Sequence, residues 1–189
     1  MKKNSYSFFV LSALGFILGM ASCNKDRFND TEKETEFVIE SAPFSIPASI
    51  KPGESDSITS FYFKVNMDSL IKKVDGRFDT TDIRTASLNS CVLTLDNPGA
   101  PDNFSNLHTC TIGMTTGKLP RIVRVATKTD IVDTPAYFLN IPNPYRPELR
   151  DVLMADSIRY RIYGNIRKSA VAPITGRARL VFYMKLSKQ

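Results

Sequence analysis

The chain has 189 residues, 25 of them basic and 19 acidic, with one histidine, three cysteines and no tryptophan. Two of the basic residues belong to an N-terminal segment with the features of an export signal, so the remaining chain has 23 basic and 19 acidic residues, a net charge of +4. This excess is too small and too dispersed to indicate a nucleic-acid-binding protein. The length fits one domain or two small ones, with enough residues for a hydrophobic core.

Residues 1–22 have the organisation of a secretory signal: a basic start, an apolar run over residues 8–20 and small residues before Cys23. The run has 13 residues, whereas a permanent membrane-spanning helix needs about 20. Residues 20–23, Met-Ala-Ser-Cys, resemble the lipobox of bacterial lipoproteins. The resemblance implies cleavage before Cys23 and a membrane anchor of lipid on that cysteine. The alternative is an ordinary signal peptide with a chance cysteine.

Residues 24–36 contain eight charged positions and a single large apolar residue, Phe28. Such a stretch cannot bury enough apolar surface to order itself, so we expect residues 23–36 to be a lipidated cysteine and a flexible tether. Lys25 and Asp26 loosely resemble the short charged export signal of lipoproteins in the Bacteroides group. This resemblance implies an outer-membrane protein exposed at the cell surface, with the inward-facing leaflet as the alternative.

From residue 37 onward apolar and polar residues alternate, which is typical of half-buried strands. The alternation is clearest over residues 44–50, 61–65, 91–95, 110–114, 158–163 and 178–186. Residues 67–74, followed by Gly76, and residues 147–154, which start with proline, favour short helices instead. Because no long helix alternates with the strands, the sequence predicts an all-β fold. We expect one antiparallel immunoglobulin-like β-sandwich over residues 37–189, with about seven to nine strands and one or two short helices.

The chain contains none of the established catalytic motifs considered below. His108 lies on the same predicted strand as Cys110 and Ile112, so we expect a structural role for it. The chain has no Gly-x-Ser-x-Gly elbow, no His-Glu-x-x-His helix and no glycine-rich phosphate loop. The sequence therefore favours a non-enzymatic protein without catalytic residues, metal or cofactor.

Cys91 and Cys110 are the two cysteines of the predicted domain, and a turn-rich loop separates them. If their strands form a hairpin centred near Ala100 and Pro101, the two thiols come opposite each other on the core face. A disulfide there would close a loop of about 20 residues and stabilise the fold by roughly 3 kcal/mol. The alternative is a pair of reduced, buried thiols that act as small apolar side chains. Because no cluster of histidines or further cysteines supports this pair, metal binding by it is not expected.

Four short segments resemble the Asp-Ser/Thr-apolar acceptor motif for O-glycosylation in Bacteroides. Several of them fall at predicted turns or at the edges of predicted elements. The resemblance implies modification of at least one hydroxyl among Ser57, Ser69, Thr80 and Ser157.

The last two predicted strands place basic and tyrosine side chains on one polar face. Its members are Arg159, Arg161, Tyr163, Arg177, Arg179, Tyr183 and Lys185. Such a face could bind anionic glycan, lipopolysaccharide phosphate or an acidic protein surface through charge-assisted hydrogen bonds. The alternative is an ordinary solvated sheet face. The absence of tryptophan disfavours a dedicated carbohydrate platform, because sugar rings commonly stack on large aromatic faces.

Together with the lipobox and the tether, residues 90–98, 119–120 and 155–164 resemble small surface lipoproteins of Bacteroides-type bacteria. The resemblance implies a non-enzymatic, lipid-anchored envelope protein that serves in adhesion or as an accessory component of an outer-membrane complex. The alternative is a glycan-binding accessory lipoprotein of a nutrient-uptake system. The expected partners are the membrane, through the lipid anchor, and an envelope protein or a glycan, but not nucleic acid.

Overall fold

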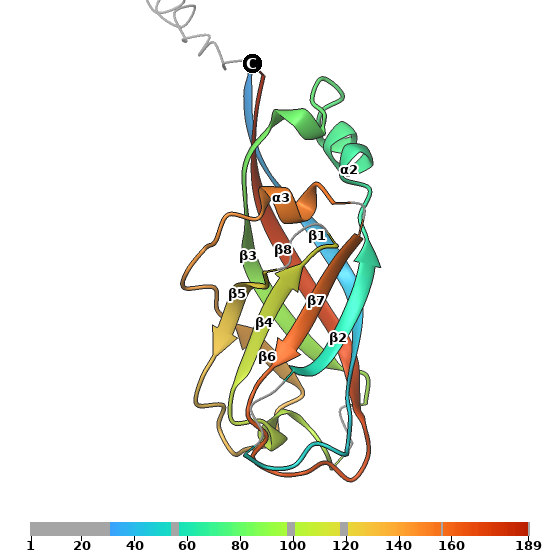
Figure 1. Ribbon diagram of the computed structural model, residues 1–189, viewed down its shortest axis with the longest axis vertical. Helices are drawn as coiled ribbons and strands as arrows, with labels where there is room; N and C mark the ends of the chain where they lie inside the picture. Colours follow the sequence, from blue (N-terminus) through green and yellow to red (C-terminus); the bar gives the residue numbers. More distant parts are fainter. Residues whose placement is uncertain (1–30, 54–56, 98–100, 118–120, 156, 189) are drawn as a thin grey trace, which may run out of the picture. The chain divides into compact units, whose positions relative to one another are not determined.

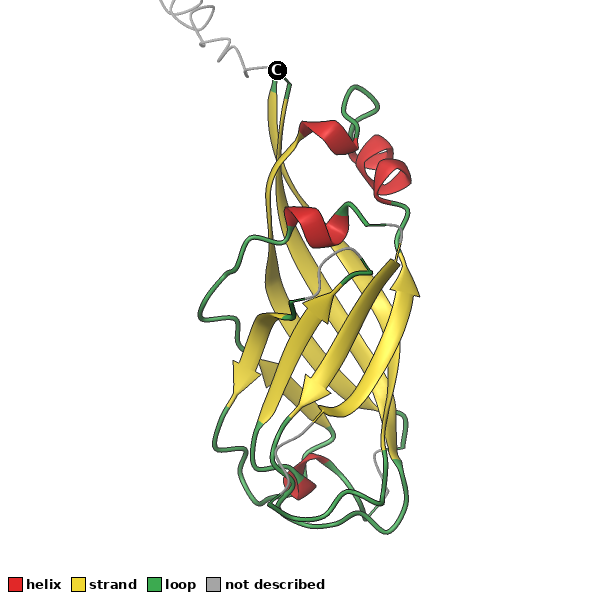
Figure 2. Ribbon diagram, in the orientation of Figure 1, coloured by secondary structure: helices red, strands yellow, loops and turns green. Residues whose placement is uncertain are grey.

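Eight strands in two antiparallel sheets make up the computed structural model, which describes residues 31–188 apart from 54–56, 98–100, 118–120 and 156 (Figure 1). The strands are β1 (Glu32–Ile46), β2 (Ser57–Lys64), β3 (Ile83–Leu95), β4 (Cys110–Thr115), β5 (Val123–Lys128), β6 (Phe138–Ile141), β7 (Ser157–Tyr163) and β8 (Ile174–Ser187). The helices are α2 (Met67–Val74), α3 (Arg150–Leu153) and the 3-10 turns η2 (Thr80–Asp82) and η3 (Phe104–Asn106). Figure 2 shows the helices near the ends of two layers of strands.

The strand order identifies how the chain is wound. One sheet has the order β1-β8-β3-β6 and the other has the order β2-β7-β4-β5. The first strand therefore pairs with the last, the second with the seventh, the third with the sixth and the fourth with the fifth. This nested pairing is the order of a jelly roll. The predicted antiparallel β-sandwich is confirmed, but its connectivity differs from the immunoglobulin-like one because most successive strands alternate between the two sheets.

Alternation along β8 builds one wall of the core. Leu180, Phe182 and Met184 are fully buried, while Arg177 and Arg179 point to solvent. This pattern follows from the period of two in a strand, which sends successive side chains to opposite faces of the sheet. The predicted core face of this strand is therefore confirmed.

The N-terminal boundary of the domain differs from the expected one. Strand β1 begins at Glu32, and its pairing with β8 runs from Glu32 opposite Ser187 to Ile46 opposite Ile174. Residues 32–36 therefore belong to a sheet, although their composition favours a flexible tether. The ladder to β8 orders this charged segment, and a distant pairing of this kind is not visible in local composition. Residues 1–22, Cys23 and the remaining tether to residue 30 lie outside the described residues.

Both predicted helices form, the second one shorter than expected. In α2, the Asn66 side chain accepts a hydrogen bond from the Ser69 amide at 2.9 Å and caps the helix. Helix α3 covers only Arg150–Leu153. Before this helix, one Glu148 carboxylate oxygen accepts hydrogen bonds from the amides of both Ala86 and Arg150, each at 2.8 Å. Because β6 pairs only with Cys91–Thr94 of β3, Glu148 supplies the acceptor that the Ala86 amide would otherwise lack. In the described part of the chain, no helix is long and apolar enough to cross a membrane.

Candidate functional site

The seven residues predicted to share one basic face are divided between two faces. Strands β7 and β8 belong to different sheets, and Figure 1 shows them in separate layers. Arg159, Arg161 and Tyr163 lie on the outer side of the β2-β7-β4-β5 sheet, and the other four residues lie on the outer side of the β1-β8-β3-β6 sheet. The prediction of one face is wrong because residues 164–173 cross from one sheet to the other instead of forming a hairpin.

The outer surface of β8, which we call the β8 face (Arg177, Arg179, Tyr183 and Lys185), is balanced by acidic residues. Its ion pairs are Arg177 Nε with Asp96 at 3.3 Å, Arg179 Nε with Glu40 at 3.2 Å and Lys185 Nζ with Glu32 at 3.1 Å. Burial, and then a hydrogen bond with Glu34, raises the pKa of Tyr183. Each basic group on this face therefore already has an acidic partner.

The opposite surface, which we call the arginine face (Tyr62, Arg124, Arg159, Arg161 and Tyr163), has a different balance. The four strands β2, β4, β5 and β7 contain no aspartate or glutamate. Among the residues that the structure describes, no carboxylate forms an ion pair with Arg124, Arg159 or Arg161. The arginine face therefore carries positive charge that has no carboxylate partner among the described residues.

Strand register brings these side chains together. Arg161 lies opposite Ser60 on β2 and Gly113 on β4, and Gly113 in turn lies opposite Arg124 on β5. Arg159 lies between Tyr62 and Thr115 in the next row of the same face. Because adjacent strands are about 4.8 Å apart, residues from four separate segments form one continuous surface.

The Arg159 side chain is positioned by its neighbours on β2. Its guanidinium lies over the Tyr62 ring, 5.1 Å from the ring centroid, and its Nη2 donates to the Ser60 hydroxyl at 3.0 Å. A cation over an aromatic face is attracted by about 0.5–1 kcal/mol at an exposed site. These contacts orient the guanidinium but leave its charge without a counter-ion among the described residues.

Three polar atoms on this face are buried and have no hydrogen-bond partner: Arg159 Nε, Arg161 Nε and the Tyr163 hydroxyl. A buried donor without an acceptor costs about 1–3 kcal/mol. An acceptor atom that reaches these donors would recover part of this cost. The arginine face therefore has hydrogen-bonding capacity that the described residues do not use.

Two shallow hollows lie on the arginine face, and Ile122 borders both. The first has a volume of about 380 Å³ and is lined by Thr111, Ile122, Arg124, Tyr163 and Gly164. The second has a volume of about 300 Å³ and is lined by Tyr62, Thr115, Thr116, Gly117, Ile122, Ser157, Arg159 and Arg161. Their volumes are at the lower end of the range for ligand sites. Each hollow combines arginine with hydroxyl groups.

Gly113 allows this arrangement. A Cβ atom at residue 113 would lie 2.5 Å from Ile122 Cγ2 and 3.0 Å from Tyr163 Cε2. Ile122 and Tyr163 therefore occupy the space over β4 that a larger residue would fill. Sequence reasoning identified Tyr163 but missed Tyr62, Arg124 and Ile122. The lack of acidic residues in all four strands was the available signal, but it becomes meaningful only when these strands are known to share a sheet.

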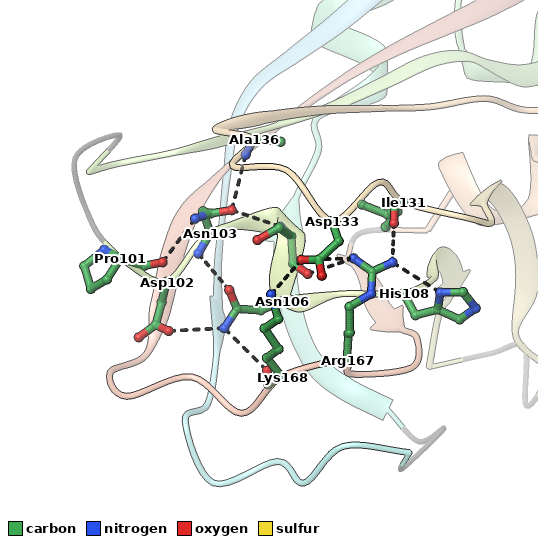
Figure 3. Close-up of polar contacts among 11 residues, drawn as sticks. Pro101, Asp102, Asn103, Asn106, His108, Ile131, Asp133, Ala136, Arg167 and Lys168 are labelled. Atoms are coloured by element: carbon green, nitrogen blue, oxygen red, sulfur yellow. Dashed lines mark hydrogen bonds and ion pairs between the residues drawn. The ribbon is translucent and has the colours of Figure 1, made fainter.

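His108 is exposed and lies before β4 rather than within it. Its Nδ1 is 3.4 Å from Arg167 Nη2, and the same guanidinium also donates to the carbonyl oxygens of Ser105 and Ile131 (Figure 3). The predicted strand position of His108 is therefore wrong, because β4 begins two residues later. Within the described residues, no group of three or more His, Cys, Asp or Glu side chains could hold a metal ion.

Figure 3 also shows a polar cluster of loop residues around Asp102. Asp102 Oδ2 accepts from the amides of Val171 and Ala172 at 2.7 and 2.9 Å, and Asp102 Oδ1 accepts from Asn106 Nδ2 at 3.1 Å. Asn103 Oδ1 accepts from the amides of Ser105 and Ala136 at 3.0 and 3.2 Å. These groups satisfy one another and tie separate loops together, so we interpret the cluster as structural.

Cys91 and Cys110 lie on different sheets. Cys91 is in β3, which pairs with β6 and β8, while Cys110 is in β4, which pairs with β5 and β7. The predicted hairpin is wrong because these consecutive strands are not neighbours in a sheet. Both thiols are free and fully buried, as in the alternative of two packed thiols, and not joined in the predicted disulfide. Burial raises the pKa of both thiols, that of Cys110 to about 12.

The raised thiol pKa values predict slow labelling of the folded protein. In a chain of residues 23–189 with Cys23 replaced by serine, which we call the Cys23→Ser mature chain, we expect neither thiol to react with a thiol reagent at pH 8 until the protein unfolds, after which both should react without reductant. Since unfolded thiols titrate near pH 8.5, the unfolded state loses protons that the folded state keeps, so the thiols' contribution to stability falls above about pH 8.5. Denaturation at pH 7.5 and 10 measures this fall, which a Cys91→Ala/Cys110→Ala variant should reduce. Rapid labelling of the folded protein, or a bridge in the unfolded one, would contradict the packed-thiol arrangement.

The four candidate glycosylation sites occupy different positions. Ser57, Ser69 and Ser157 are exposed, whereas Thr80 is half-buried in η2. The aspartates that precede Ser57 and Ser157 in the acceptor motif lie outside the described residues. Modification of these residues stays a prediction. A sugar on Ser157 would cover the second hollow, because this residue lines it.

Comparison with known proteins gives a limited result. No protein-family model and no curated protein matches the chain. Among solved structures, one titled Desmodium yellow mottle tymovirus is similar over 82% of this chain and 89% of its own, with 14% sequence identity and a TM-score of 0.25. A TM-score this low supports no argument about family or function. The function must therefore be inferred from the arginine face.

Proposed function

We propose that this chain is a non-enzymatic, lipid-anchored outer-membrane protein, exposed at the cell surface, that binds an anionic partner through the arginine face. It would serve in adhesion or as an accessory component of an envelope complex. The observation that carries the proposal is the contrast between the two outer faces. Basic residues of the β8 face have acidic partners, whereas Arg124, Arg159 and Arg161 form no ion pair with a described carboxylate.

This contrast decides which face an anion would choose. On the β8 face, a ligand would compete with carboxylates such as Glu40, which already pairs with Arg179. On the arginine face, Arg159 and Arg161 can bind an oxyanion without displacing a described carboxylate. Hydrogen bonds to charged groups contribute about 1.5–3 kcal/mol each. Two guanidiniums on one strand would therefore give a substantial part of a micromolar affinity, which corresponds to about 8 kcal/mol.

A glycan-binding accessory lipoprotein of a nutrient-uptake system is the second candidate function. The hydroxyl groups of Thr111, Thr115 and Thr116 favour it, because they lie beside the arginines in the two hollows. The exposed Tyr62 ring at the border of the second hollow adds an aromatic surface. This candidate uses the same face as the first and differs from it in the chemistry of the partner.

The anchor is tested at Cys23. Replacing Cys23 by serine should abolish lipid labelling and release the protein from the membrane fraction, because serine cannot form the thioether that holds the lipid. Metabolic labelling with a fatty acid and sedimentation of membranes measure both effects. A serine variant that is still labelled and still sediments with membranes would show that the lipoprotein interpretation is wrong.

The binding face is tested by a matched pair of double variants. In one variant Arg159 and Arg161 become glutamine, and in the control Arg177 and Arg179 become glutamine, so both lose two positive charges from one strand. We expect the first to weaken binding of the Cys23→Ser mature chain to dextran sulfate at least tenfold, and the control to change it less than twofold. Equal losses would mean that net charge, and not the arginine face, determines binding.

A further inference from the structure

We infer that the ligand of the arginine face is an acidic polysaccharide that occupies both hollows. This inference rests on the function proposed above and adds the chemical class of the partner. The arginines, hydroxyls and exposed tyrosine of the face match a polymer that offers oxyanions, hydroxyl groups and apolar ring surfaces in turn.

The position of the site within the sheet disfavours an extended acidic peptide. Peptides that bind to sheets usually add a strand at an edge, where backbone groups are unpaired. Arg159 and Arg161 lie on β7, which is hydrogen-bonded on one side to β2 and on the other to β4. Recognition at these two arginines must therefore use side chains, and the side chains available are guanidinium, phenol and hydroxyl groups.

The spacing of the arginines favours a polymer over a small anion. Arg124 lies on β5 and Arg161 on β7, with β4 between them, so their backbones are about 10 Å apart. A single phosphate or carboxylate cannot fill both hollows, because Ile122 lies between them as a wall of each. A chain with repeated acidic groups can place one group in each hollow.

The distribution of apolar side chains disfavours a membrane surface as the ligand. A protein face that lies on lipid usually inserts large apolar residues between the headgroups. Most of the exposed large apolar side chains in the described residues, such as Val132, Phe138 and Val171, lie outside the strands of this sheet. Tyr62 is the exception, with 67% of its surface exposed. Arg159 lies over one side of the Tyr62 ring. The same ring borders the second hollow, so a sugar ring in this hollow can pack on it.

The test compares polymers that differ in one property at a time. Binding of the Cys23→Ser mature chain would be measured against polygalacturonate, poly-L-glutamate, dextran sulfate, neutral dextran and phosphatidylglycerol vesicles. Polygalacturonate and poly-L-glutamate both carry carboxylates and differ in their backbone, whereas dextran sulfate distinguishes sulfate from carboxylate as the acidic group.

We expect polygalacturonate or dextran sulfate to bind at least tenfold more tightly than poly-L-glutamate, and neutral dextran not to bind. Arg124→Gln and Arg161→Gln should each weaken this binding at least fivefold, since they remove one arginine from each hollow, while Arg179→Gln should not. Equal binding of poly-L-glutamate, preference for vesicles, or an unchanged affinity of the Arg124→Gln variant would overturn the inference but leave the arginine face as an anion-binding surface. If Arg179→Gln weakened binding as much as Arg124→Gln and Arg161→Gln do, the proposed function itself would be overturned.

Discussion

Replacing Phe182 by alanine is expected to lower the free energy of unfolding by about 3–5 kcal/mol. Phe182 is fully buried on β8 and stacks on Phe37 of β1, with ring centroids 4.8 Å apart. It lies opposite Phe37 on one side and Leu88 of β3 on the other, so its loss opens a cavity between three strands. Denaturant unfolding followed by circular dichroism measures the change.

The matched control is Arg179→Ala, three residues away on the same strand but on the outer face. Arg179 forms an ion pair with Glu40, and both side chains are largely exposed. Exposed pairs of this kind contribute little, so the variant should remain within roughly 0.5 kcal/mol of the wild type. If the arginine variant is destabilised as much as the phenylalanine variant, the assignment of faces along β8 is wrong.

Replacing Asp102 by alanine is expected to destabilise the protein by about 2–5 kcal/mol, because the substitution removes the acceptor of one buried and two part-buried hydrogen bonds, each worth about 0.5–3 kcal/mol. The donors are the backbone amides of Val171 and Ala172 and the side-chain amide of Asn106. Asp102 itself is only 8% exposed, so water cannot readily take the place of the carboxylate. Thermal and denaturant unfolding of the Cys23→Ser mature chain measure the loss.

Asp133→Ala is the appropriate control, since Asp133 is an exposed carboxylate at the same cluster. Its main partner is Lys168, at 2.7 Å, and both side chains are more than one third exposed. We expect little change in stability for this variant. A similar effect of the two substitutions would show that Asp102 contributes only charge and does not hold the loops together.

The sequence was informative where local pattern decides the structure. The alternation around Phe182 predicted a strand and its core face, and the spacing over residues 67–74 predicted α2, because each depends only on the period of a single element. Pairing between elements was not predictable in this way. A period of two tells which side of a strand is buried, but not which strand lies next to it, so β7 and β8 were expected as neighbours although they lie in different sheets.

The same limit applies to the candidate site. Arg159 and Arg161 were predicted because they alternate with buried residues on one strand. Their separation from Arg177, and their proximity to Tyr62 and Arg124, depend on pairings between segments that are far apart in the sequence. The charge difference between the two faces arises from these pairings, since the acidic residues of β1 lie beside β8 and not beside β7.

Pairing of β1 with β8 has a mechanical consequence for a lipid-anchored protein held by a ligand. Tension from the membrane would enter at the start of β1, while the ligand would resist on the other sheet. For a pull directed along β1, the ladder from Glu32 to Ile46 is loaded in shear, because its hydrogen bonds are perpendicular to the strands. Such a load shears many bonds at once instead of peeling them apart one by one. The domain is therefore suited to bear tension that is directed along β1.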